Sequence, residues 1–312
     1  MLSRRSVRIK VMQLLYSINR DSDVNLEKAI KQYWKDINES YELFLFNLYT
    51  ILQISKVAYE DEDKRKAKYL PTEGDKLFKP TLIENALMQD LDKNANIQKV
   101  FDKHLFASKC DKDIFRNIYF EYSKEQSYID FLKIEAPTND QVLETLLDLF
   151  RFCRKYEIYN EMIEDQYVTW DDDKSLIIGS IKKVLKELPS VAKDFYKEYY
   201  PDEETTKEFG ETILIRTFED DNALLEIIRP VLKNWNPDRV AIIDMIFLKM
   251  AVTEFICFES IPPKVTMNEY VELSKIYSTS KSKEFINGVL DKVAEQLTKQ
   301  GKINKSGRGL ME

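Results

Sequence analysis

Arginine and aromatic side chains gather near the start of the sequence. Arg4, Arg5 and Arg8 are followed by Gln13 and Tyr16. A guanidinium group binds phosphate through paired hydrogen bonds and also stacks on bases. An accessible aromatic ring offers a surface on which an unpaired base stacks. These residue types predict contact with single-stranded nucleic acid, although an arginine-rich end taken alone is more often a solvated tail.

Charge is distributed unevenly along the 312 residues. The chain carries a net charge of −7, yet residues 1–20 carry +5 and residues 299–312 carry +3. The 278 residues between them therefore carry −15. An acidic protein is not a general nucleic-acid binder, but a basic patch on an acidic body binds anions at one place.

Several kinds of chemistry are excluded by what the sequence lacks. His104 is the single histidine, so a His-based catalytic triad or a multi-His metal site is not expected. The three cysteines, Cys110, Cys153 and Cys257, are far apart in the sequence and odd in number. This pattern indicates reduced thiols in a cytoplasmic protein rather than a set of disulfides. The longest apolar run, residues 43–54, is too short to span a membrane. We expect a soluble cytoplasmic protein that is not an enzyme and has no metal or cofactor.

The residues that could do chemistry must be positioned by helices. Glycine is scarce, at 7 of 312 residues, and apolar residues recur with helical spacing, so the fold class is expected to be all-α. A loop is expected over residues 70–81, and residues 189–206 are expected to hold at most a short helix between breaks. Helices are expected over residues 4–18, 26 to about 67, within 82–136, from 138, from 171, over 239–258, 266–277 and 282 to about 297.

The first of these helices is predicted to be amphipathic. Its buried stripe is expected to contain Val7, Val11, Leu14, Leu15 and Ile18. At about 100° per residue, a flank beside this stripe collects four further side chains. These are Arg5, Arg8, Met12 and Tyr16. Basic and aromatic groups would therefore share one edge of a helix that is anchored in a core.

Local signals mark the ends of other helices. Residues 138–141 and 266–269 match the capping-box pattern, and Asn236-Pro237-Asp238 has the N-cap and first-turn residues of a helix start. Gly288 lies inside a helical pattern, where glycine costs about 1 kcal/mol relative to alanine. We expect another helix or a ligand to approach closely at that glycine.

Two distant segments resemble the NusB family of bacterial transcription antitermination factors. The first is Arg4-Arg5-Ser6-Val7-Arg8 leading to Gln13-Leu14-Leu15-Tyr16. The second begins with Asn234-Trp235, Asp238-Arg239 and Ile243-Asp244. It continues with Leu248-Lys249-Met250-Ala251, Glu254, residues 261–269 and residues 271–275, and it ends with Phe285-Ile286-Asn287-Gly288-Val289-Leu290-Asp291. The order and spacing of this series make the resemblance specific.

The resemblance covers residues 1–20 and 205–298, and it implies a NusB-like double helical bundle that binds RNA. Residues 22–200 have no counterpart that can be aligned, so we expect a helical insertion there. The insertion should be ordered, because it contains too many large apolar residues to leave in water. Residues 299–312 are expected to form a basic C-terminal tail.

The family resemblance also implies a function and a set of contact residues. Family members bind boxA, a single-stranded RNA element of ribosomal RNA leader transcripts, together with ribosomal protein NusE. The complex joins an RNA polymerase elongation complex and suppresses termination without catalysis. Matching positions assign a contact with NusE to Asp244. They assign RNA binding to Arg4, Arg5, Arg8, Gln13, Tyr16 and Phe285.

The sequence departs from the family at three positions, and a different function stays open. Ser6 replaces a frequent arginine, Thr253 a frequent aromatic residue, and Lys281 an acid found in some relatives. Tyr16 and Phe285 could be ordinary core aromatics. The alternative function is an acidic helical adaptor for ribosomal or transcription proteins, with no RNA role of its own.

Overall fold

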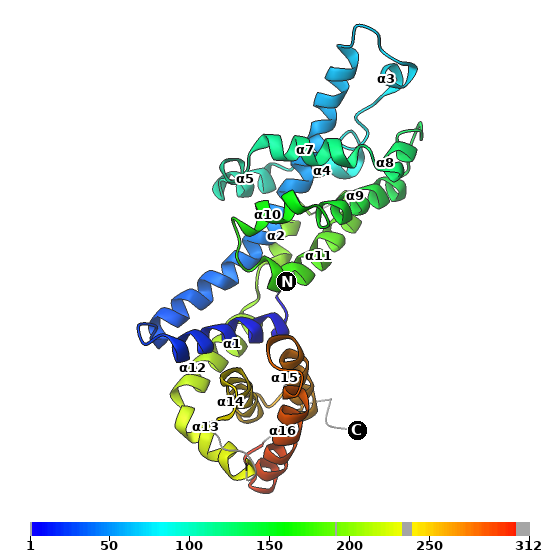
Figure 1. Ribbon diagram of the computed structural model, residues 1–312. Helices are drawn as coiled ribbons and strands as arrows, with labels where there is room; N and C mark the ends of the chain where they lie inside the picture. The colour runs from blue at the N-terminus through cyan, green and yellow to red at the C-terminus, as the bar shows by residue number, and fades with distance from the viewer. Residues whose placement is uncertain (1, 191, 233–238, 304–312) are drawn as a thin grey trace. The chain divides into compact units, whose positions relative to one another are not determined.

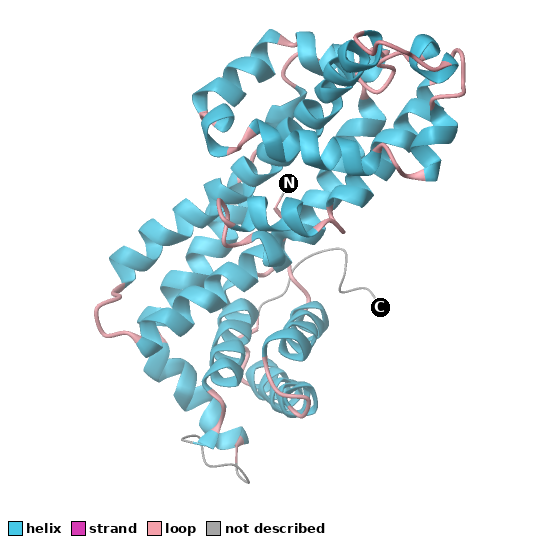
Figure 2. Ribbon diagram, turned by 45° about the horizontal axis from the view of Figure 1, so that its top comes forward, coloured by secondary structure: helices cyan, strands magenta, loops and turns pink. Residues whose placement is uncertain are grey.

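Every regular element that the structure describes is a helix. The structure is a computed structural model, and it describes residues 2–190, 192–232 and 239–303 (Figures 1 and 2). The all-α prediction is therefore confirmed for these residues. The α-helices are α1 (Arg4–Arg20), α2 (Leu26–Lys66), α3 (Glu73–Leu77), α4 (Ala86–Lys93), α5 (Ala95–Lys103), α6 (Phe106–Lys109), α7 (Lys112–Tyr122), α8 (Gln126–Phe131), α9 (Asn139–Cys153), α10 (Glu157–Glu164), α11 (Trp170–Glu187), α12 (Thr212–Glu219), α13 (Asp221–Ile228), α14 (Ile242–Cys257), α15 (Pro263–Tyr277) and α16 (Ser282–Lys299). The others are the 3₁₀ helices η1 (Phe195–Tyr199) and η3 (Arg229–Val231) and the π-helix η2 (Glu204–Glu211).

The chain divides into two units. The terminal unit contains Leu2–Ile37 and Pro201–Glu312, and the middle unit contains Asn38–Tyr200. Helix α2 contributes its first residues to the terminal unit and its remainder to the middle unit. The candidate RNA-binding residues therefore all belong to the terminal unit.

Helix α14 is the central helix of the terminal unit. It packs against α1, α12, α13, α15 and α16, which surround it in Figure 1. Most of its residues are buried, including Phe247, Met250 and Phe255. A helix covered on all sides must be apolar around its whole circumference. Any polar side chain on α14 then needs a partner inside the unit.

Helix α1 is anchored by its apolar stripe, as the sequence predicts. Val7, Val11, Leu14 and Leu15 are buried, and Ile18 is half-buried. The helix begins after Ser3, whose hydroxyl oxygen accepts a hydrogen bond from the Ser6 amide. It packs on η2, α12 and α14. The register of α1 in the terminal unit is thus set by burial.

Close packing of η2 depends on the absence of a side chain at Gly210. A Cβ atom there would lie 2.0 Å from the Tyr33 hydroxyl oxygen and 2.3 Å from Val7 Cγ1. The Tyr33 hydroxyl donates a 2.6 Å hydrogen bond to the Thr206 carbonyl of the same π-helix. The first turns of α2, helix α1 and η2 therefore meet at Gly210.

The middle unit has its own large core. Phe44, Phe46, Ile51, Leu146 and Phe150 are among its fully buried side chains, and long helix α2 contributes many of them. Helix α9 begins with the capping box that the sequence predicts, in which Thr138 and Gln141 exchange side chain-to-backbone hydrogen bonds. The apolar residues expected in the insertion are therefore packed together.

Part of the loop expected over residues 70–81 is a helix. Helix α3 starts with a capping box formed by Thr72 and Asp75. The buried Asp75 carboxylate also accepts a 2.8 Å hydrogen bond from Lys68 and lies 3.5 Å from Arg65. These partners stabilise a helix of only five residues, which periodicity cannot reveal.

Two other predicted helix starts need correction. Helix α15 begins at Pro263 rather than Thr266, because proline suits the first turn, where its missing N–H is not needed. Helix α14 begins at Ile242, after an Ala241 N-cap, rather than at residue 239. The proposed start at Asn236-Pro237-Asp238 lies outside the described residues.

Candidate nucleic-acid interface

Arg5 is the most accessible of the three arginines at the start of α1. Its side chain is 47% exposed and forms a bidentate ion pair with Glu269 of α15. Nε and Nη2 each donate a 2.9 Å hydrogen bond to the carboxylate. These hydrogen bonds raise the pKa of the Arg5 guanidinium above its ordinary value. The pairing occupies one edge of the planar group, and Nη1 has no acceptor among the described residues.

Arg4 lies on the other side of the helix start. Its Nη2 atom donates a 2.8 Å hydrogen bond to Glu204 of η2, and its side chain is 38% exposed. The guanidinium carbon is 5.4 Å from the centre of the Phe209 ring. A surface ion pair of this kind contributes little stability, so an RNA phosphate could compete with Glu204 for Arg4.

Arg8 does not lie on the exposed flank where the sequence analysis places it. Its side chain is 3% exposed, and it forms a bidentate ion pair with the fully buried Glu254 of α14. The Nε–Oε2 and Nη2–Oε1 distances are 2.9 and 2.5 Å. The guanidinium also lies over Phe209, at 4.9 Å, and Tyr270, at 5.7 Å. This position leaves Arg8 no surface with which to contact RNA.

The charge state of Arg8 follows from this pairing. Burial alone would lower the pKa of Arg8, but hydrogen bonds and charge attraction from Glu254 outweigh it and raise that pKa. The Glu254 carboxylate also accepts hydrogen bonds from Thr266, at 2.7 Å, and Tyr270, at 3.2 Å. Sequence periodicity missed this network, although an acid inside a strongly apolar helix is a signal for it.

The two ion pairs form one alternating series of charges. Arg8 Nη1 lies 3.5 Å from Glu269, the carboxylate that also holds Arg5. Glu254, Arg8, Glu269 and Arg5 therefore follow one another from the interior of the terminal unit to its surface. Helices α1, α14 and α15 are joined by this series, which fixes where Arg5 reaches the surface.

Tyr16 and Gln13 lie further along α1. Tyr16 is 37% exposed and Gln13 is half-buried, whereas Met12 of the predicted flank is buried. Eleven residues separate Arg5 from Tyr16, which corresponds to about 16 Å along a helix. A single nucleotide cannot contact both, but a short single strand that follows α1 can.

Phe285 and Gly288 lie one turn apart on α16. Phe285 is half-buried and Gly288 is exposed. A Cβ atom added at Gly288 would have no atom of the described residues within 4 Å, so the predicted close approach of another helix is wrong. Helix α16 packs along α15, the helix that carries Glu269. An open surface next to a partly accessible aromatic ring is what a stacked base requires.

Asp244 is buried rather than presented to a partner. It is 6% exposed and accepts hydrogen bonds from Ser278, at 2.6 Å, and Ser282, at 2.8 Å. These serines flank the connection between α15 and α16. The carboxylate therefore joins the start of α14 to that connection, and little of Asp244 is exposed for the predicted contact with a partner.

A groove with a mixed apolar and polar lining lies in the terminal unit, and we call it the α1–α14 groove. Its volume is about 620 Å³ and its walls come from α1, α12, α13 and α14. Leu15, Ile18, Phe218 and Met245 line it, and Phe218 is 37% exposed. The Lys249–Asp221 ion pair lies at its edge. Such a groove suits an apolar side chain of another protein.

Two further properties concern the described residues as a whole. They contain no group of three His, Cys, Asp or Glu side chains placed to hold a metal ion. No described helix is long and apolar enough to cross a membrane.

Comparison with known proteins identifies relatives of the chain. The model of the NusB family matches residues 153–295. The transcription antitermination protein NusB of Salinibacter ruber is 42% identical over 107 residues, which are 34% of this chain and 67% of that protein. NusB of Chloroherpeton thalassium is 43% identical over 79 residues, 25% of this chain and 37% of that protein. NusB of Natranaerobius thermophilus is 40% identical over 92 residues, 30% of this chain and 66% of that protein.

These matches cover only part of each protein. The chain spans between 37% and 67% of the length of the three relatives, and each match covers about a third of the chain or less. No solved structure matches the chain.

Proposed function

The chain belongs to the NusB family, and we propose that it is a transcription antitermination factor that binds boxA-like single-stranded RNA in ribosomal RNA leader transcripts. The family consists of antitermination proteins rather than enzymes, in agreement with the expectation that the chain is not an enzyme. RNA binding by this chain requires a surface that recognises phosphate and unpaired bases. The terminal unit offers such a surface along α1 and α16.

The geometry of Arg5 carries the proposal. Glu269 holds Nε and Nη2 of the guanidinium, while the side chain stays 47% exposed. The remaining N–H groups are then oriented before any ligand arrives, and they match the two oxygens of a phosphate. Pre-orientation reduces the conformational entropy that is lost on binding. Arg4, 38% exposed, adds a second cation to the same end of α1.

Aromatic and amide groups complete the proposed RNA path. Tyr16 on α1 and Phe285 on α16 are partly accessible, so each offers ring surface to an unpaired base. Gln13 lies one turn before Tyr16 and can hydrogen-bond to a base edge or a ribose hydroxyl. Arg8 supports this path by holding α1 against α14 and α15, and it has no direct RNA contact in the proposal.

We infer that ribosomal protein NusE binds at the α1–α14 groove rather than through Asp244. The groove exposes Phe218 among other apolar and polar residues, whereas Asp244 accepts hydrogen bonds from Ser278 and Ser282. A groove of about 620 Å³ accommodates a large apolar side chain of a partner. The complex of this chain, NusE and RNA would then join an elongating RNA polymerase, which places the protein in the cytoplasm.

The proposal is tested by titrating the full chain with a labelled RNA that contains a boxA-like element, with and without NusE. We expect saturable binding that NusE strengthens and that a scrambled RNA of equal length does not reproduce. Equal affinity for the two RNAs in both conditions would contradict the proposal. Binding to NusE with no contribution from RNA would favour the alternative function of a protein adaptor.

A further inference from the structure

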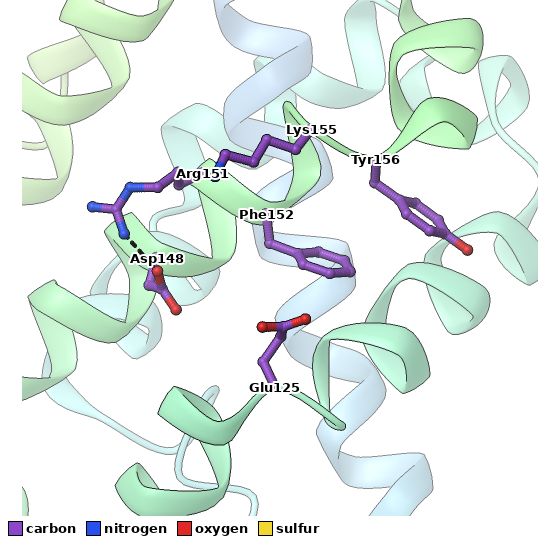
Figure 3. Close-up of a pocket in the computed structure, with 6 residues that line it drawn as sticks. All are labelled: Glu125, Asp148, Arg151, Phe152, Lys155 and Tyr156. Atoms are coloured by element: carbon purple, nitrogen blue, oxygen red, sulfur yellow. Dashed lines mark hydrogen bonds and ion pairs between the residues drawn. The ribbon is translucent and has the colours of Figure 1, made fainter.

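The middle unit has a groove that lies outside the RNA path proposed along α1 and α16. Two hollows lie between α8 and α9, with volumes of about 300 and 560 Å³. They adjoin each other because Asp148 and Arg151 line both. We call the pair the α8–α9 groove. The smaller hollow is shown in Figure 3.

Part of the lining of the α8–α9 groove is apolar. Ile134, Leu147, Phe152 and Tyr156 line it, and all four are only partly buried where they pack against the core of the middle unit. The Phe152 and Tyr156 rings stack with their centres 5.4 Å apart and their planes 21° apart. Figure 3 shows the Phe152 ring projecting into the smaller hollow above the Glu125 carboxylate. These hollows therefore present apolar and aromatic surface that a ligand would bury.

The rim of the groove has carboxylates with no partner. Glu125 and Glu144 are exposed, and neither forms an ion pair or side-chain hydrogen bond among the described residues. Asp148, in contrast, accepts hydrogen bonds from Arg151 and Ser127, both at 2.6 Å. Arg151 is thereby neutralised inside the groove. Lys155 is the one remaining cation of the lining.

We propose that the α8–α9 groove binds a basic amphipathic segment of a partner protein. A lysine or arginine side chain would lie over the Phe152 and Tyr156 rings, near Glu125, where cation–π attraction and a carboxylate act together. An apolar side chain of the same segment would fill the larger hollow between Ile134 and Leu147. Glu144 would pair with a second cation of the segment.

Charge favours a basic protein over nucleic acid at this groove. Among the described residues, the carboxylates of Glu125 and Glu144 and the ammonium group of Lys155 have no partner in the groove lining. Residues 38–200 as a whole contain more acidic than basic side chains. Phosphates brought to the groove would be repelled by Glu125 and Glu144. A cationic peptide gains attraction from each of these features.

The test measures binding of the full chain to a fluorescent peptide in which Leu recurs at helical spacing and Lys or Arg fills the other positions. We expect the Glu125→Lys/Glu144→Lys variant to bind this peptide about tenfold more weakly or worse, since two attractions become repulsions. Lys155→Glu should strengthen binding. A matched peptide with Glu in place of Lys and Arg should not bind to the unmodified chain.

The control variant is Glu161→Lys/Glu164→Lys. It makes the same change in net charge at two exposed positions of α10 in the same unit, outside the groove lining. Peptide affinity within about twofold of the unmodified chain is expected for it. An equal loss in both double variants would show attraction to overall charge and overturn the proposal. Weaker binding of a single-stranded RNA to Lys155→Glu, with no peptide binding, would assign the groove to nucleic acid and also overturn it.

Discussion

Arg8 and Glu254 form a buried bidentate ion pair, and Arg5 repeats the same geometry with Glu269 one turn earlier at the surface. The two arginines have the same side chain and lie on the same helix, yet their surroundings assign them different tasks. Arg8 is enclosed by Phe209 and Tyr270 and joins three helices. Arg5 keeps half of its side chain in water and can meet a ligand.

Removing the Arg8 side chain should destabilise the terminal unit. Arg8→Ala leaves the Glu254 charge buried without a counter-charge, and breaking a buried pair in this way costs about 3–5 kcal/mol. Urea unfolding, monitored at the tryptophans, measures the free energy of unfolding. Arg5→Ala is the matched control, because its exposed pair with Glu269 should contribute about 1 kcal/mol or less. Equal losses in the two variants would contradict the different roles assigned to these arginines.

The Gly288→Ala substitution should raise the stability of the protein and weaken its binding to RNA. An exposed alanine inside α16 is expected to raise the free energy of unfolding by about 0.5–1 kcal/mol, since no described atom lies near the added methyl group. RNA affinity should fall several-fold, because the methyl group occupies open surface of α16 one turn from Phe285. Gly179→Ala on α11 also adds a methyl group with no described atom within 4 Å and should leave RNA affinity unchanged. Unchanged RNA binding in Gly288→Ala would remove this face of α16 from the RNA path.

Phe218→Ser should weaken binding of NusE. Phe218 is a partly exposed aromatic residue of the α1–α14 groove, and loss of such an anchor costs more than about 1 kcal/mol, or about fivefold in affinity. Calorimetric titration of the full chain with NusE measures the change. Val265→Ser is the control, since Val265 is 47% exposed but does not line the groove. If both variants bound NusE as the unmodified chain does, the groove would not be the docking surface.

Asp75 should make the middle unit less stable in acid. A hydrogen bond from Lys68, followed by those from Thr72, lowers the pKa of Asp75 below its ordinary 3.8. A carboxylate with a lowered pKa stabilises the folded state above its unfolded pKa, and that contribution is lost as pH falls further. Asp75→Asn should therefore show a smaller fall in melting temperature between about pH 5 and pH 2.5 than the unmodified chain.

A matched carboxylate near Asp75 provides the control for this pH dependence. Glu73 lies two residues earlier on α3 and is exposed, with only a surface pair to Lys76. Glu73→Gln should keep the pH dependence of the unmodified chain. Parallel melting curves for Asp75→Asn and the unmodified chain across this pH range would contradict the assignment.

Helix periodicity and burial could be predicted from the sequence. The stripe from Val7 to Leu15 and the apolar residues around Phe46 and Phe150 are buried as expected, since each follows from hydrophobic spacing along one chain segment. The capping box at Thr138 was also predicted, because it depends on residues three apart. Apolar stripes and capping boxes can be predicted because they depend only on residues that are close together in the sequence.

Tertiary pairing explains what the sequence could not predict. Helical spacing placed Arg8 beside Arg5, but its burial depends on Glu254, which is 246 positions away. Asp244 likewise depends on serines at the connection between α15 and α16. The short helix α3 depends on the capping residue Thr72 and on Lys68. A polar side chain can be interpreted only when its partner is known.

The measurement that tests the account most directly is the salt dependence of RNA affinity for Arg5→Glu, compared with Arg20→Glu. Arg20 lies at the far end of α1, is exposed, and gives the same change in charge. Loss of one phosphate contact on a single strand reduces the slope of log K against log salt by about 0.7. We expect this smaller slope and a weaker RNA affinity for Arg5→Glu, whereas the slope and the affinity of Arg20→Glu should be nearly unchanged. Equal slopes and affinities in the two folded variants would contradict an RNA site at the start of α1.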